Sequence, residues 1–423
     1  SATDAIMLGW IDQTSLSAVS LAGQVQFVLS LFISGIAAGA GIMAAQYWGK
    51  RDAASIEKVI PIALRTNLLF SGLFTILAGF CPEILMRIFT NDAALVASGS
   101  QYLRAVALSY VLCGISQVYL ILLKNTGHAA VSSRISSTAV VLNIILNAIL
   151  IYGLCGAPAL GIRGAAYATV AARVVELIWA YLETKKPERV RILWNRLFSS
   201  AGKILSEDFW RYTLPVLAAS LVWGIAYVLY SVIMGHMGSD AVAANSITSI
   251  AKSLLSCLIR GVSGGAGVLI GNLPGANELE KAREYGGRLS HLSIAIGIVT
   301  GGLLMLISPA IVHFAPLSDT AAEYLQYMLL FCGLNLMAQS VNTTVLDGIF
   351  CAGGDAKFDM QGNIGAMWCF SVPLGFLAAF WLKLPVMVVY CIVNLDEIVK
   401  LPAVYHHYKK YIWVRNITRD VED

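Results

Sequence analysis

A nearly unbroken series of long apolar runs constrains this chain more than any other feature. The runs extend over about 20 residues or more, and short polar turns separate them along the whole 423 residues. Only 13% of the residues are charged, against about 25% in a typical soluble domain, and the mean hydropathy is +0.72. Apolar helices of this length can cross the hydrocarbon core of a bilayer. The sequence therefore predicts an all-α polytopic membrane protein.

Twelve transmembrane helices are expected from these runs. The opening segment, SATDAIMLGW, is typical of the end of a helix, so we expect the first transmembrane helix to be truncated. The runs fall at residues 1–9, 17–46, 56–86, 93–123, 131–154, 161–183, 212–236, 240–272, 285–315, 320–351, 361–382 and 384–405.

The chain divides into two similar halves around one extended polar stretch. Residues 39–49, GAGIMAAQYWG, resemble residues 265–275, GAGVLIGNLPG. A repeat of six spans is even-numbered, so a pseudo-two-fold axis along the membrane normal relates two six-helix lobes, as in secondary transporters. The expected parts are the N-terminal lobe (1–184), a cytoplasmic inter-lobe connection (185–211), the C-terminal lobe (212–411) and a cytoplasmic tail (412–423).

Lysine and arginine are concentrated in alternate loops. The loops between them hold few cations, and positive charge marks the cytoplasmic side of a membrane protein. We therefore expect a multi-pass protein of the cytoplasmic membrane with both termini in the cytoplasm. The central connection alone contains Lys185, Lys186, Arg189, Arg191, Arg196 and Lys203.

Several segments, in this order and spacing, resemble bacterial members of the multidrug and toxic compound extrusion (MATE) family. They are DAIMLG with LSAVSLA near the start, GAGIMAAQYWG, LNIILNAILIYG, GIRGAAYATV, SDAVAANSI and AGGDAK. The resemblance covers essentially the whole chain and implies a twelve-helix, two-lobed fold. It also implies export of organic compounds in exchange for Na+ or H+.

Four polar residues of the N-terminal half are candidates for a coupling-ion site: Asp4, Asn143, Asn147 and Thr169. Asn143 and Asn147 lie four residues apart in an apolar run, so their side chains share one helix face and need partners inside the protein. The resemblance implies that Asp4 and Asn143 belong to the cation site of the N-terminal lobe. A carboxylate with amide and hydroxyl oxygens suits Na+, and a desolvated carboxyl group can instead take a proton.

Each of these residues also has a structural interpretation. Intramembrane asparagines commonly hold helices together, and Asp4 could be an interfacial residue near a chain end.

Asn147 stands where some members of the family have aspartate. We therefore expect a site with one carboxylate and a coupling stoichiometry of one charge at most.

The C-terminal half lacks an acidic pair that some members of the family carry. By alignment, Trp223 or Ser220 replaces the glutamate and Ser340 replaces the aspartate, so we expect no ion site of that type in the C-terminal lobe. We interpret the charges in the last span as a structural network. They are Asp396, Glu397 and Lys400.

Five residues are candidates for a substrate cavity: Gln24, Trp223, Tyr227, Lys252 and Arg260. Trp223 and Tyr227 lie four residues apart, and aromatic faces suit flat or cationic compounds. Lys252 and Arg260 lie roughly on one helix face, where an unpaired cation in lipid would be costly. The alternatives are core packing for the aromatic pair, a wet cavity for Lys252, and pairing of Arg260 with one of three carboxylates: Glu176, Asp347 or Asp396.

The sequence thus predicts a cation-coupled antiporter, driven by Na+ or H+, that exports amphipathic organic compounds by alternating access. We expect no enzymatic activity, no cofactor beyond the coupling ion, a monomer in the lipid bilayer, and no nucleic-acid partner. The eight cysteines form no C-x-x-C pair and no Cys/His cluster, which argues against a metal or redox site. A flippase for lipid-linked substrates from the same wider superfamily is the alternative, because Lys252 and Arg260 could line a cationic cleft.

Overall fold

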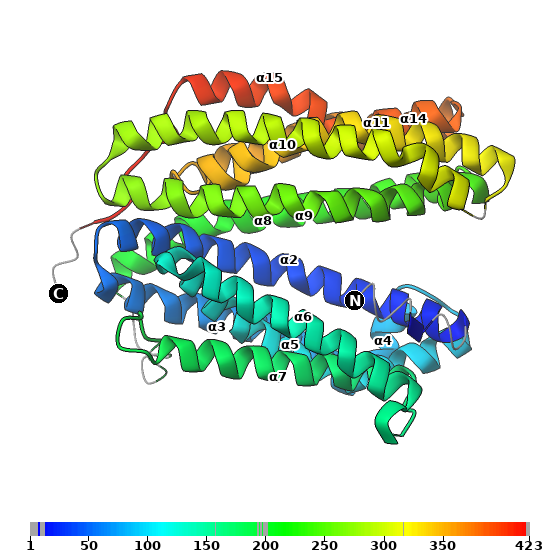
Figure 1. The fold of residues 1–423 in the computed structure, drawn as a ribbon, viewed down its shortest axis with the longest axis horizontal. Helices are drawn as coiled ribbons and strands as arrows, with labels where there is room; N and C mark the ends of the chain where they lie inside the picture. Colours follow the sequence, from blue (N-terminus) through cyan, green and yellow to red (C-terminus); the bar gives the residue numbers. More distant parts are fainter. Residues whose placement is uncertain are drawn as a thin grey trace. The chain divides into compact units, whose positions relative to one another are not determined.

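The computed structural model of this chain consists of α-helices with short π-helical and 3-10 segments (Figure 1). It describes residues 7–8, 13–156, 158–192, 194, 197, 202–315 and 317–419, and no strand occurs among them. The all-α prediction is therefore confirmed. The chain forms two compact units. The N-terminal unit is Ser1–Ala44 with Asp52–Thr213, and the C-terminal unit is Ala45–Arg51 with Leu214–Asp423. The lobe boundaries drawn from the sequence stay a prediction.

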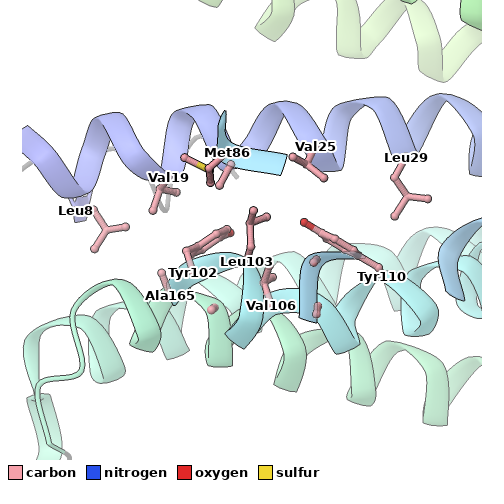
Figure 2. Close-up of a cluster of buried hydrophobic side chains, with 14 of the residues drawn as sticks. Leu8, Val19, Val25, Leu29, Met86, Tyr102, Leu103, Val106, Tyr110 and Ala165 are labelled. Atoms are coloured by element: carbon pink, nitrogen blue, oxygen red, sulfur yellow. The ribbon is translucent and has the colours of Figure 1, made fainter. Parts of the chain in front are cut away.

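Long helices fill the N-terminal unit. Helix α5 packs against α3 and α7, and α6 packs against α7. Figure 2 shows the apolar core of this unit, in which side chains such as Leu8, Val25, Leu103 and Val106 are buried together. The helices are α2 (Gln13–Gly49), α3 (Ala53–Phe80), α4 (Pro82–Arg87), α5 (Ala93–Leu123), α6 (Ala129–Tyr152) and α7 (Ile162–Thr184).

The predicted fourth and fifth spans follow each other without an open loop. Helix α5 runs into the π-helical segment η1 (Lys124–His128), in which Thr126 and Gly127 have non-helical dihedral angles. Gly127 has φ +81°, a conformation that glycine adopts without steric cost. The chain therefore bends at this glycine, and α6 starts at Ala129.

The C-terminal unit is built around α9, α10 and α11, which pack against one another. Helix α8 (Lys203–Gly235) leads into it. After α11 the helices are short and π-helical segments separate them. The remaining elements are α9 (Ser239–Gly275), α10 (Leu279–Phe314), α11 (Asp319–Thr343), η4 (Thr344–Phe350), α12 (Ala356–Asn363), η5 (Ile364–Ser371), α13 (Val372–Phe376), η6 (Leu377–Trp381), α14 (Val386–Val393) and α15 (Asp396–Lys409).

The described residues include nine helical segments that are long and apolar enough to cross a membrane. One of them, Ala93–Tyr152, contains both α5 and α6. The first predicted span falls largely outside the described residues, and the last one consists of two short helices. The multi-span prediction is confirmed, whereas the count of twelve is only partly confirmed.

The last predicted span, residues 384–405, is broken at Asn394. Helix α14 ends there and α15 begins at Asp396. The Asn394 carbonyl oxygen accepts a hydrogen bond from Asn335 Nδ2 at 2.6 Å, and Lys252 Nζ donates to Asn335 Oδ1 at 2.9 Å. Asn335 of α11 therefore satisfies the backbone at the break, as buried backbone requires, and Lys252 of α9 holds the Asn335 side chain.

The end of α2 and the C-terminal tail meet within the C-terminal unit. The buried Gln46 side chain donates to the carbonyl oxygens of Ala352 and Arg415, at 3.0 and 3.2 Å. Its Oε1 accepts from the Ile417 backbone N–H at 2.9 Å. A single glutamine thus satisfies three backbone groups and holds the tail in place.

Candidate functional site

A polar cluster crosses the interface between α6 and α7 in the N-terminal unit. Asn147 Nδ2 donates to Asn143 Oδ1 at 3.3 Å, and Asn143 Nδ2 donates to Thr169 Oγ1 at 3.3 Å. Thr169 Oγ1 donates in turn to the Ala165 carbonyl oxygen at 3.1 Å. Asn147 is fully buried, while Asn143 and Thr169 are half-buried. Three of the four predicted coupling residues therefore form one hydrogen-bonded chain.

Close packing of the two helices makes this contact possible. A Cβ atom at Gly164 would lie 2.4 Å from the Leu150 carbonyl oxygen, so only glycine allows α7 to approach α6 so closely here. Thr169 follows on the same helix and reaches Asn143 across the interface. The glycine and the polar cluster are therefore parts of one helix interface.

The fourth coupling candidate, Asp4, lies outside the described residues. The nearest described residue is Met7, whose carbonyl oxygen accepts a hydrogen bond from the Tyr152 hydroxyl at 2.7 Å. Tyr152 is at the C-terminal end of α6, the helix that carries Asn143 and Asn147.

A partly buried ion pair lies one turn beyond Thr169 on α7. Arg173 Nη1 donates to both carboxylate oxygens of Glu176 at 2.9 Å, and Ser116 Oγ donates to Glu176 Oε1 at 2.6 Å. Glu176 is 3% exposed. Within this unit the cation paired with Glu176 is therefore Arg173.

Three of the predicted cavity residues lie together in the C-terminal unit. The rings of Trp223 and Tyr227 are stacked, with centroids 5.6 Å apart and an interplanar angle of 17°. The Arg260 guanidinium lies 5.6 Å from the Trp223 ring centroid, which is within range of a cation–π interaction. Arg260 is exposed, and Tyr227 is 41% exposed. This aromatic–arginine cluster of Trp223, Tyr227 and Arg260 offers a flat, positively charged surface.

The other two cavity candidates lie elsewhere. Lys252 is hydrogen-bonded to Asn335 at the helix break, and Gln24 is an exposed residue of α2 in the N-terminal unit. Among the described residues Arg260 forms no ion pair within 4.0 Å, although its charge acts on Asp347. The Asp396 carboxylate is paired with Lys400 instead.

The charged residues of the last span contact one another, as expected for a charge network. Lys400 Nζ lies 3.6 Å from Asp396 Oδ2 and 3.4 Å from Glu397 Oε1. Asn342 Nδ2 donates to Glu397 Oε2 at 2.8 Å. A further carboxylate, Asp359, is buried on α12.

Sequence reasoning missed Asp359 because it precedes the apolar run that begins at residue 361. The available signal was its spacing from Asn363, four residues later, which places both side chains on one helix face. Asn363 Nδ2 does donate to Asp359 Oδ1, at 3.0 Å. In the part of the chain that the structure describes, no group of three His, Cys, Asp or Glu residues could hold a metal ion.

Comparison with known families decides where this chain belongs. A family model described as MatE matches residues 1–149 and 215–377. The chain belongs to this family, the MATE transporters. The resemblance inferred from the sequence segments is therefore confirmed.

Relatives and solved structures agree with a MATE transporter. Uncharacterized transporter YisQ of Bacillus subtilis is 21% identical over 97% of this chain and 90% of its own length. Probable multidrug resistance protein NorM of Thermotoga maritima is 23% identical over 90% of this chain and 82% of its own length. A MOP superfamily transporter from Pyrococcus furiosus has a TM-score of 0.87 at 20% identity, over 97% of this chain and 90% of that one. At this identity the structural likeness shows the fold alone.

Proposed function

We propose that this MATE protein is an antiporter that exports amphipathic organic compounds from the cytoplasm in exchange for Na+ or H+. The observation that carries the proposal is the hydrogen-bonded chain of Asn143, Asn147 and Thr169 inside the N-terminal unit. Family membership and relatives named as probable multidrug resistance proteins support export as the activity. The predicted lobes, residues 1–184 and 212–411, alternate access by rocking against each other.

Asp4 completes the coupling site in this proposal. It lies three residues before Met7 in the sequence. Met7 is hydrogen-bonded to Tyr152 of α6, and Tyr152 follows Asn147 by about 7.5 Å of helix rise. The carboxylate supplies the charge, and the amide and hydroxyl groups supply neutral oxygen ligands.

Ion binding can drive export only if the ion binds two conformations with different affinity. Entry of the ion from outside favours release of substrate to the outside, and its discharge inside resets the protein. With one carboxylate in this site, at most one positive charge is exchanged through it in each cycle.

We assign the substrate surface to the aromatic–arginine cluster of the C-terminal unit. Aromatic faces bind flat amphipathic compounds, and the Arg260 guanidinium disfavours compounds that carry only positive charge. The protein acts as a monomer in the cytoplasmic membrane with both termini in the cytoplasm. The asymmetric distribution of lysine and arginine supports this orientation.

Uptake into inverted membrane vesicles tests the proposed activity. An imposed Na+ or pH gradient is expected to drive accumulation of a fluorescent amphipathic compound that also has an acidic group. Matched vesicles without the protein, and vesicles with the gradient collapsed by an ionophore, are the controls. If neither gradient changes the uptake of any compound in a broad panel, the antiporter proposal is contradicted.

A flippase for lipid-linked anionic substrates is the second candidate. The exposed Arg260 over Trp223 favours it, because a guanidinium can bind a phosphate group. A fluorescent lipid that carries a diphosphate headgroup distinguishes the two. Its translocation in proteoliposomes, without transport of water-soluble compounds, would favour the flippase.

A further inference from the structure

Three buried carboxyl groups lie near the break in the last span. Asp396 and Glu397 begin α15, and Asp359 belongs to α12, which packs against α15. Their exposed fractions are 5%, 9% and 4%. Lys400, 4% exposed, lies within 4.0 Å of Asp396 and Glu397. We call these four residues the break cluster.

The charges of the break cluster do not balance. Lys252 of α9 acts on Asp396 and Glu397 from farther away, while its ammonium group is hydrogen-bonded to Asn335. Even when Lys252 is counted with Lys400, three carboxylates face two ammonium groups. A buried charge without a counter-charge is strongly unfavourable, and such a group is neutralised instead.

Charged and titratable groups on the neighbouring elements do not remove the imbalance. Asp347 of η4 and Arg260 of α9 carry opposite charges that act on each other. Tyr230 of α8 and Cys351 act on these carboxyl groups without adding positive charge. His407, which follows on α15, is bonded to Asp355 at 2.8 Å.

Asn342 of α11 gives an independent indication of a proton. Its Nδ2 donates to Oε2 and to the backbone oxygen of Glu397, and the residue is 1% exposed. Its Oδ1 accepts no hydrogen bond from the described residues. An ionised carboxylate can only accept, whereas a protonated carboxyl group has an O–H to donate. A proton in the break cluster would remove the excess charge, and it would supply a hydrogen-bond donor beside the Asn342 amide.

We propose that the break cluster binds one exchangeable proton, as a second cation site in addition to the one around Asp4. The proton resides on a carboxyl oxygen and exchanges with water, and no other bond changes. Asp347 of η4 acts electrostatically on Asp359 from a neighbouring element. Lys400 already occupies the position between Asp396 and Glu397 that a metal ion would need.

Infrared difference spectroscopy of the purified full-length protein in detergent tests this proposal. The wild type is expected to show a buried protonated-carboxyl C=O band, shifted from that of solvated carboxyls, that is lost as the pH rises. Asp359→Asn and Glu397→Gln are each expected to remove or shift this band. Glu280→Gln, at a side chain that is 85% exposed, and Asp4→Asn are expected to retain it.

A wild-type spectrum without such a band would overturn the proposal, and so would a band that persists unchanged in both variants. A band that NaCl removes at constant pH would show a sodium site instead and also contradict it. Even if the variants do not fold, a wild-type spectrum without the band is enough to overturn the proposal. Because the measurement needs no transport, a protein that fails as an antiporter still gives a clear result.

Discussion

Replacing Lys400 with methionine is expected to lower the free energy of unfolding by about 3–5 kcal/mol. The Lys400 ammonium lies 3.6 Å from Asp396 and 3.4 Å from Glu397 inside the C-terminal unit. Methionine is an unbranched side chain one atom shorter than lysine, and it leaves the buried carboxylates without their nearest cation. The midpoint of thermal unfolding in detergent measures the effect. The decrease in the free energy of unfolding should be smaller at acidic pH, because the carboxyl groups then take protons and the uncompensated charge disappears.

Lys186→Met is the matched control for this variant. Lys186 also forms an ion pair, with Glu183 at 2.8 Å, but its side chain is 57% exposed. Arg189 still contacts Glu183 in that variant, so little change is expected. Equal unfolding midpoints for Lys400→Met and the wild type at neutral pH would contradict the account of the break cluster.

Gly164→Ala is expected to destabilise the N-terminal unit by about 1–3 kcal/mol. The new Cβ would lie 2.4 Å from the Leu150 carbonyl oxygen and 3.1 Å from the Ile151 nitrogen. These are backbone atoms, so α6 and α7 must separate. Because the same interface holds Thr169 against Asn143, coupled transport should fall together with the unfolding midpoint.

Gly72→Ala separates this effect from the general effect of removing a helix glycine. Gly72 lies in α3 of the same unit, and no neighbouring atom lies within 4 Å of its expected Cβ. Alanine there should be neutral or stabilising by about 0.5–1 kcal/mol, because it has the higher helix propensity. If Gly164→Ala and Gly72→Ala change the unfolding midpoint equally, the close approach of α6 and α7 at Gly164 does not stabilise the N-terminal unit.

Much of the fold could be predicted because membrane helices are local structures. Apolar length alone indicates the spans, and helical periodicity places Asn143 and Asn147 on one face. The break at Asn394 could not be predicted in this way. It depends on Asn335, a residue far away in the sequence that satisfies the exposed backbone.

The candidate sites were also predictable to different degrees, because some of their contacts join residues that are close in the sequence and others do not. The contact between Asn143 and Thr169 joins two neighbouring helices, and both residues were candidates for the same site in the sequence. The bond from Asn342 to Glu397 joins residues that are 55 positions apart, and one sequence contains no information on such pairs. Asp359 was missed because charged residues just outside an apolar run are usually solvated.

The claim that the cation site around Asp4 drives export is tested most directly by one variant, Asp4→Asn. Wild type and variant are reconstituted in proteoliposomes, and transport is driven separately by a Na+ gradient and by a pH gradient. We expect the gradient that drives the wild type to lose its effect by about 5- to 150-fold in the variant, the range of a coupling free energy of 1–3 kcal/mol. Substrate binding without a gradient should persist. Unchanged transport under both gradients would contradict the proposed coupling site.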